Sequence, residues 1–156
     1  MLRKTFILIF FLFVCSCGYQ PIYSKKNIAN NSFSINELLF EGDKSINLKI
    51  KERLSNYKLV KKDRNFKLKI KSNSDKIILA KNVAGNPTHF KIIVAISVEI
   101  VSENSKKNTL RIEENFEYNN SAGKFSLKKY EKEIKNNLAE ISADKLILRL
   151  SSIQWS

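Results

Sequence analysis

The 156-residue sequence contains few of the residue types that build metal sites. It has two cysteines, Cys15 and Cys17, and one histidine, His89. A structural zinc site needs about four Cys, His or carboxylate ligands, and a Cys-x-Cys pair with one distant histidine does not supply them. No other cluster of metal ligands is present in the sequence. We therefore predict no metal and no cofactor.

Motifs of the common enzyme classes are also missing. There is no Gly-x-Ser-x-Gly turn for a nucleophilic serine, and AGKF at 122–125 lacks the spacing and the Ser or Thr of a phosphate-binding loop. Glu113 and Glu114 are adjacent, so on a strand they point to opposite faces and cannot act as a catalytic pair. His89 precedes an apolar strand pattern and is assigned a structural or solvated role. We predict no catalytic residue and a binding or assembly module.

The N-terminus has the pattern of a secretory signal peptide. Arg3 and Lys4 precede FILIFFLFVC, an uncharged run at 6–15. A membrane-spanning helix needs about 20 apolar residues, so this run is too short to span. A basic start, a short apolar stretch and then small residues are typical of a cleaved signal, which we place at residues 1–16.

The sequence VCSC at 14–17 resembles a bacterial lipobox, in which the last Cys is lipidated and becomes the first residue of the mature chain. We predict that Cys17 carries an S-diacylglycerol and an N-acyl group, since cleavage before Cys15 would place bulky Val14 where a small side chain is needed. Cleavage before Cys17 discards Cys15 and leaves no disulfide. Several acyl chains give firm membrane anchoring. The residue after Cys17 is Gly18 and not Asp, which favours sorting of the lipoprotein to the outer membrane.

The chain is strongly basic, with 28 Lys and Arg against 15 Asp and Glu, a net charge of +13. One interpretation is an anionic partner such as a lipid headgroup surface, an acidic glycolipid or nucleic acid. The other is a codon bias toward Lys, Asn and Ile, with the charge carried on a solvated surface. Nucleic acid is excluded for two reasons. Export to a membrane separates the protein from most nucleic acid. The strand aromatics Phe90, Phe116 and Tyr118 also share an apolar face that helices should cover.

The mature chain is predicted to form a tether at 17–32 and a single domain at 33–156. Pro21, Tyr19 and Tyr23 could instead dock the tether onto the domain. Strict alternation of apolar and polar residues predicts strands, and a four-residue apolar period predicts helices. Strands are expected at 33–41, at 66–71 with a continuation at 76–81 after a break at Ser72–Asp75, at 89–101 and at 109–118. Helices are expected at 44–57, capped by Asp43 or Ser45, and at 126–150, capped by Ser126.

Each predicted helix has one apolar stripe and the long strands have one apolar face. The stripe of the last helix is expected to contain Leu127, Tyr130, Ile134, Leu138, Ile141 and Leu148, widened by Leu146, Leu150 and Ile153. Burying these surfaces requires an α+β fold in which two helices pack on one face of a small, mainly antiparallel four-stranded sheet, in the order β-α-β-β-β-α.

The segment CGYQPIY at 17–23 resembles the mature N-terminus of the LPS-assembly lipoprotein family LptE, of the alphaproteobacterial type. The last helical segment, 130–150, is similar to the closing helix of that family. The chain departs from the pattern in Ile22, where Leu is usual, and in a more Lys-rich body. The resemblance implies two helices against a four-stranded sheet, in agreement with the fold expected from the residue pattern.

The same resemblance implies an outer-membrane lipoprotein, anchored through lipid, whose domain lies on the periplasmic side within the lumen of the LptD-type β-barrel. That pair inserts lipopolysaccharide into the outer leaflet, so the implied partners are the barrel and lipopolysaccharide. Lys81 and Lys91 flank the predicted loop at 82–88 and Lys124 lies in the predicted loop at 119–124, which makes them the candidate ligand-binding residues. The alternatives are that these are ordinary surface lysines, and that the protein is a structural outer-membrane lipoprotein or barrel-assembly scaffold without lipopolysaccharide binding.

Overall fold

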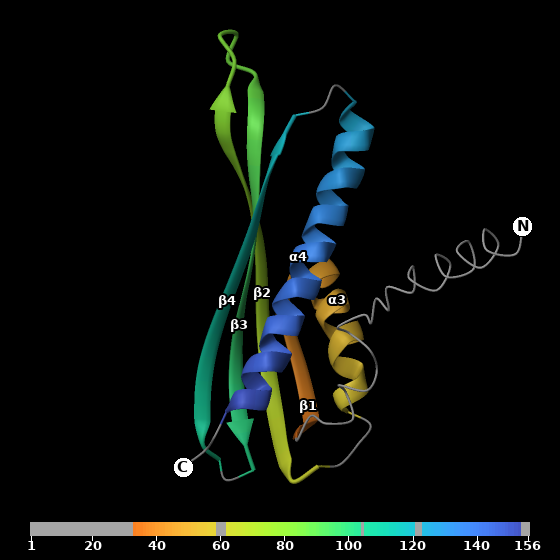
Figure 1. The fold of residues 1–156 in the computed structure, drawn as a ribbon, viewed down its shortest axis with the longest axis vertical. Coiled ribbons are helices and arrows are strands. Elements are labelled where there is room, and N and C mark those ends of the chain that lie inside the picture. Colours follow the sequence, from red (N-terminus) through yellow and green to blue (C-terminus); the bar gives the residue numbers. More distant parts are fainter. Residues whose placement is uncertain (1–32, 59–61, 104, 121–122, 154–156) are drawn as a thin grey trace, which may run out of the picture. The chain divides into compact units, whose positions relative to one another are not determined.

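The computed structural model of the chain describes residues 33–58, 62–103, 105–120 and 123–153. The predicted signal peptide, the predicted lipidation site Cys17 and the predicted tether all lie outside these residues. The elements, labelled as in Figure 1, are β1 (Phe33–Gly42), α3 (Lys44–Leu54), a 3₁₀ turn η1 (Ser55–Tyr57), β2 (Arg64–Lys81), β3 (Pro87–Ser102), β4 (Lys107–Asn119) and α4 (Lys124–Ser152). Neither described helix is both long enough and apolar enough to cross a membrane.

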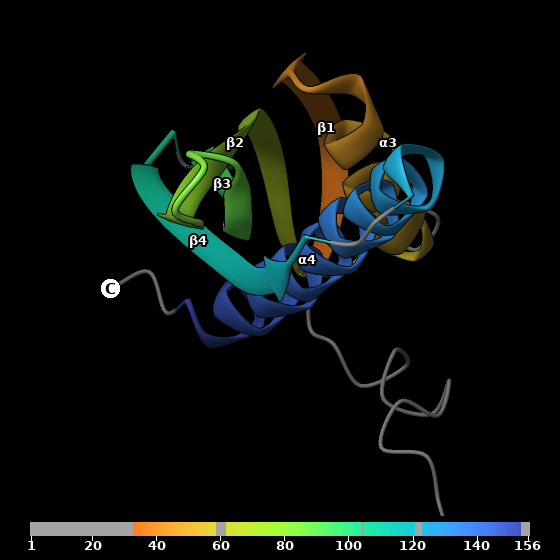
Figure 2. The same ribbon diagram turned by 90° about the horizontal axis from the view of Figure 1, so that it is seen from above.

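The four strands form one sheet in the order β1-β2-β3-β4. β1 pairs with β2 in parallel, while β2 with β3 and β3 with β4 pair antiparallel. Both helices lie on the same face of this sheet, as the view in Figure 2 shows. The predicted α+β fold and its element order are confirmed.

The strict alternation in β3 is what decides the two faces of the sheet. Every second residue from Phe90 to Ile100 is buried under the helices, and the residues between them face away. α3 buries Ile46, Ile50 and Leu54, four residues apart, against this face. The period of two in the strand and of about four in the helix therefore produce one shared core.

Asp43 joins α3, β2 and α4. It is the N-cap of α3, and its Oδ1 accepts hydrogen bonds from the backbone N–H of Ser45 at 2.9 Å and of Ile46 at 3.3 Å. Its Oδ2 accepts from Ser74 Oγ in β2 and from Lys135 Nζ in α4, both at 3.1 Å. Burial by itself raises the pKa of Asp43, but the hydrogen bonds from the Ser45 hydroxyl, from Lys135 and from the backbone N–H groups of Ile46 and Ser45 outweigh it and hold the pKa well below the ordinary value. The prediction that Asp43 or Ser45 caps this helix is settled in favour of Asp43.

Three local expectations are wrong. β2 is continuous through Ser72–Asp75, because Ser72 is buried and its Oγ donates to Asn47 Oδ1 at 2.7 Å while pairing with β3 goes on without interruption. α4 begins earlier than expected, with Gly123 as N-cap, so Ser126 lies inside its first turn and donates from Oγ to the Gly123 carbonyl at 2.8 Å.

The third error concerns the buried stripe of α4. Tyr130, Ile141 and Leu148 are exposed, Leu148 by 68%. The buried positions between Ile134 and Leu150 are instead occupied by a mixture of large and small residues, namely Leu138, Ala139, Ser142, Ala143 and Leu146. Small side chains face α3 because α3 approaches α4 closely, with Arg53 reaching both Glu140 and Asp144. A stripe predicted from the largest apolar residues therefore leaves out the small buried residues of α4.

Candidate functional site

The end of the β2–β3 hairpin extends beyond β4. Asn119, the last residue of β4, pairs with His89, and the hairpin continues past it through 80–87. The turn is closed by hydrogen bonds from Asn82 N–H to the Asn86 carbonyl and from Gly85 N–H to the Asn82 carbonyl, both 2.9 Å. Gly85 has a φ of +81°, which glycine adopts without strain. The predicted loop with Gly85 at its centre is therefore present, and its geometry is set by its own backbone.

An aromatic and ionic cluster attaches this hairpin to α4. Phe90 stacks on Tyr118 at 5.5 Å between ring centroids, and Tyr118 meets the edge of Tyr130 at 5.9 Å. The Tyr118 hydroxyl donates to Glu131 at 2.8 Å, and Lys76 forms an ion pair with the same carboxylate at 2.5 Å. Burial, followed by the Glu131 carboxylate, raises the pKa of Tyr118 above its ordinary value. The cluster holds the hairpin and the start of α4 together at one end of the sheet (Figure 1).

We call this end, formed by residues 76–91 of the hairpin and 124–131 of α4, the hairpin end. It carries six of the eleven large apolar side chains that are exposed among the described residues. They are Ile77, Ile78, Leu79, Val83, Phe125 and Tyr130. Scattered exposed apolar residues are normal, but a concentration of them at one end of a domain marks a contact surface.

The three lysines predicted as ligand-binding residues all belong to the hairpin end. Lys81 ends β2 and Lys124 begins α4; both are exposed, and neither forms an ion pair with a described residue. Lys91 differs, because its Nζ lies 2.8 Å from Glu117 Oε1. The hydrogen bonds from Lys91 and then His89 lower the pKa of Glu117. Lys81 and Lys124 are thus the two cations of the set that are available to an external anion.

The start of α4 is basic as well as apolar. Its first turn contains no acidic residue, while Lys124, Lys128 and Lys129 lie within its first six residues. Positive side chains at a helix N-terminus oppose the helix dipole, and an anion bound there would relieve this repulsion. The hairpin end therefore combines apolar side chains with cations. Such a surface is complementary to an amphiphile that has a negatively charged headgroup.

The residues considered for catalysis are engaged in structural contacts. His89 Nδ1 lies 2.8 Å from Asn119 Oδ1, and its Nε2 lies 3.5 Å from Glu117. Glu113 pairs with Arg111 on the open face of the sheet, whereas Glu114 pairs with Lys145 on the helix-covered face, so the two carboxylates do point apart as predicted. Among the described residues, no group of three His, Cys, Asp or Glu side chains could hold a metal ion.

The fold matches solved bacterial lipoproteins. One is rare lipoprotein B from Shewanella oneidensis, with a TM-score of 0.59 and 16% identity over 75% of this chain and 95% of that chain. Another is a minor lipoprotein from Acinetobacter baumannii, with a TM-score of 0.59 and 11% identity over 78% of this chain and 92% of that chain. A third is lipoprotein B from Nitrosomonas europaea, with a TM-score of 0.52 and 12% identity over 78% of this chain and 86% of that chain. No protein-family model and no curated protein matches the sequence. At these identities the shared feature is the fold.

The apolar part of the hairpin end was missed in the sequence. The sequence pattern predicts KIILAK at 76–81 as the continuation of a half-buried strand. The signal that was available is the lack of alternation in Ile77, Ile78 and Leu79, which puts apolar residues on both faces of a strand. β1 ends at Gly42, opposite Ser72, so the later part of β2 has no neighbouring strand on that side among the described residues, and Ile77, Ile78 and Leu79 stay exposed.

Proposed function

We propose that this chain is an outer-membrane lipoprotein of the LptE type, which binds lipopolysaccharide and partners an LptD-type β-barrel. The observation that carries the proposal is the hairpin end, where exposed apolar side chains lie beside Lys81 and Lys124. The lipid A part of lipopolysaccharide presents phosphates and acyl chains together. Lysine ammonium groups bind the phosphates, and the apolar tip contacts the proximal acyl chains.

The remaining parts of the proposal come from the N-terminus and from the fold. Cys17 carries the lipid anchor, in line with the lipobox at 14–17 and the family resemblance at 17–23. The fold shared with bacterial lipoproteins supports the same class. The domain lies in the lumen of the barrel on the periplasmic side, where its many charged side chains suit a polar lumen. The chain acts as an assembly and binding subunit and not as an enzyme.

Binding of purified rough-type lipopolysaccharide to the lipid-anchored protein in detergent tests the ligand. Replacing Lys81 and Lys124 together by Glu is expected to weaken binding at least tenfold, and Lys91→Glu is expected to have a smaller effect because Lys91 is already paired with Glu117. The matched control is Lys51→Glu, an exposed lysine of α3 that does not belong to the hairpin end. Undiminished binding by the double variant would contradict the assignment of these residues.

A second variant separates acyl-chain contact from phosphate contact. Leu79→Ser is expected to weaken binding of intact lipopolysaccharide and to leave binding of its deacylated form unchanged, because only the intact molecule has chains to meet the apolar tip. Equal losses for the two ligands would show that Leu79 acts through the fold of the tip.

The partner is tested by purifying the C-terminally tagged protein from solubilised envelopes and identifying its companions and its N-terminal peptide by mass spectrometry. A stoichiometric barrel, together with an acylated Cys17, is the expected result. A barrel that copurifies without any lipopolysaccharide binding would favour the structural-scaffold alternative. An N-terminal peptide without acyl groups on Cys17 would contradict the lipoprotein assignment.

A further inference from the structure

β4 is the last strand of the sheet, and one of its edges has no neighbouring strand among the described residues. The hydrogen bonds from Ser102 N–H to the Lys106 carbonyl and from Asn120 N–H to the Thr88 carbonyl show which β4 residues bond to β3. Because bonded and non-bonded pairs alternate along an antiparallel ladder, the even-numbered residues of β4 bond to β3. The odd-numbered residues therefore direct their N–H and C=O groups outward, along the whole length from Thr109 to Glu117.

These odd-numbered residues also carry an ordered pattern of charge on the open face of the sheet. The pattern is Lys107, Thr109, Arg111, Glu113, Asn115, Glu117. Positions at equal distances from Ile112 carry opposite charges: Arg111 and Glu113 lie one residue away, and Lys107 and Glu117 lie five residues away. Thr109 and Asn115, three residues away, are both uncharged. Charged side chains on an edge normally discourage strands from adding to it. This arrangement repels most strands but is complementary to itself when the second strand is antiparallel.

Among the registers within two residues of one another, one satisfies the pattern. With Ile112 opposite Ile112 of a second copy, Arg111 faces Glu113 and Lys107 faces Glu117, each of them twice because of the two-fold symmetry. A shift of two residues in one direction brings Arg111 opposite itself, and a shift in the other direction brings Glu113 opposite itself. Like charges directly opposite each other are destabilising. The matched register also places odd-numbered residues opposite odd-numbered residues, as bonding between two outward-facing edges requires.

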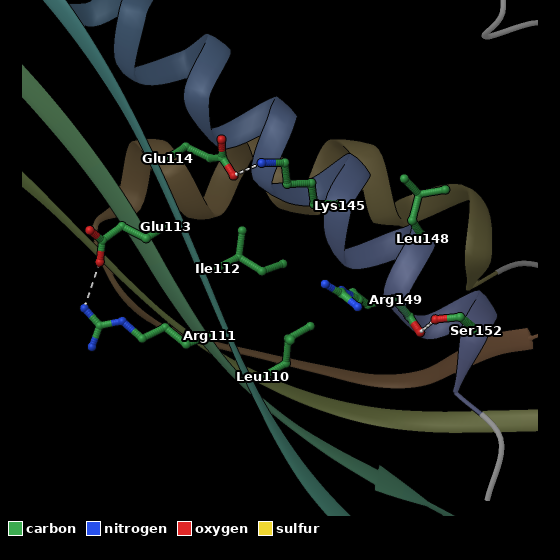
Figure 3. A pocket seen from close by; sticks show the side chains of 9 residues that line it. All are labelled: Leu110, Arg111, Ile112, Glu113, Glu114, Lys145, Leu148, Arg149 and Ser152. Atoms are coloured by element: carbon green, nitrogen blue, oxygen red, sulfur yellow. Dashed lines mark hydrogen bonds and ion pairs between the residues drawn. The ribbon is translucent and has the colours of Figure 1, made fainter.

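A groove with a volume of about 520 Å³ lies beside this edge, between β4 and the C-terminal half of α4 (Figure 3). Leu110 and Ile112 line it from β4, and Leu148 lines it from α4. Leu148 is largely exposed, and the side chain of Arg149 forms no ion pair with a described residue. In the matched register Glu114 of the second copy comes opposite Leu110, on the same face as Arg149. The groove thus offers an apolar contact and an uncompensated cation where an added strand would lie.

We propose that two copies of this chain associate through β4, antiparallel and centred on Ile112, so that their sheets become one continuous sheet. This inference rests on the backbone pairing and charges of β4 and on the adjacent groove, and it describes copies that are not enclosed in a barrel, because a domain inside a lumen could not extend its sheet into a second copy. It also accounts for the exposed Leu148, which the second copy covers.

The test uses two full-length copies with different tags, expressed together and extracted from membranes in mild detergent. Parent copies are expected to copurify. Arg111→Glu in both copies places four glutamates at the centre, and the copurified fraction is expected to fall at least tenfold. Arg111→Glu on one copy with Glu113→Arg on the other restores complementarity and is expected to restore copurification, as is the swap of both residues within each copy. Because each single change is rescued by a second, loss of folding cannot mimic this outcome.

Disulfide trapping distinguishes direct pairing from copurification through a third protein. Arg111→Cys on one copy and Glu113→Cys on the other would have Cα atoms about 5.5 Å apart, within the range that a disulfide spans. Arg111→Cys with Asn119→Cys, about 20 Å apart in this register, is the control. A cross-link in the first combination alone supports the proposal. Parent copies that do not copurify, an Arg111→Glu variant that copurifies as well as the parent, or equal cross-linking in both combinations would overturn it.

Discussion

Replacing Asp43 by Ala should destabilise the domain by about 2–4 kcal/mol. The change removes the N-cap of α3, which contributes about 0.5–2 kcal/mol. It also removes the acceptor for Ser74 and Lys135, which link α3 to β2 and α4. Hydrogen bonds to a charged group contribute about 1.5–3 kcal/mol, and the lower part of that range applies because the Lys135 side chain is partly exposed.

Urea denaturation of the chain from Gly18 onward, followed by circular dichroism, measures this loss. With a slope of roughly 1.5 kcal/mol/M for a domain of this size, the midpoint should fall by about 2 M. Asp43→Asn keeps an oxygen that can cap the helix but loses the charge, so it should cost only about 1–2 kcal/mol. Asp63→Ala, at an exposed position, removes the same charge and should change stability by less than about 0.5 kcal/mol.

The pH dependence checks the same reasoning. The pKa of Asp43 is lower in the folded chain than its value of about 3.9 in an unfolded chain, so the folded state binds this proton more weakly. The stabilisation is therefore fully present above about pH 5 and is lost as the pH falls below about 4. The stability difference between the parent and Asp43→Asn should shrink over that interval. A difference that is constant with pH, or an Asp43→Ala variant as stable as the parent, would refute this account.

Two further predictions concern the backbone and the corrected face of α4. Gly42 has a φ of +93°, and an added Cβ would lie 1.9 Å from the Ser72 carbonyl oxygen, so Gly42→Ala should lower the free energy of unfolding by about 3 kcal/mol or more. Gly85 has a φ of +81° with open space around it, so Gly85→Ala should lower it by only about 1 kcal/mol. Similar urea midpoints for the two variants would show that β1 can move away from Ser72. Leu146→Ala should cost about 2–5 kcal/mol because Leu146 is fully buried, while Leu148→Ala should cost less than about 0.5 kcal/mol in the monomer. A reversed order in thermal denaturation would mean that Leu148, and not Leu146, lies in the buried stripe of α4.

The sequence by itself determined the fold class and the element order. Alternation in 89–101 and the four-residue period in α3 are local patterns that report which side of an element is apolar, and two such helices and one such sheet have a single simple way to bury those sides. The cap of α3 was limited to Asp43 or Ser45 by the sequence, since capping is a contact between residues two or three apart, and the structure decided for Asp43. Local physics was sufficient wherever the relevant partners were close in the chain.

Only the tertiary structure decided features that depend on distant partners. The buried line of α4 passes through Ala139, Ser142 and Ala143 because α3 lies close against it, and neither size nor period of the α4 residues reveals that approach. Ser72 stays within β2 because Asn47, 25 residues away, accepts its hydrogen bond. The exposure of Ile77, Ile78 and Leu79 follows from β1 ending opposite Ser72, which leaves the later part of β2 without a described neighbour on that side. Likewise, the charge pattern of β4 acquires its meaning only because that strand lies at an edge of the sheet, where its outward backbone groups have no described neighbour.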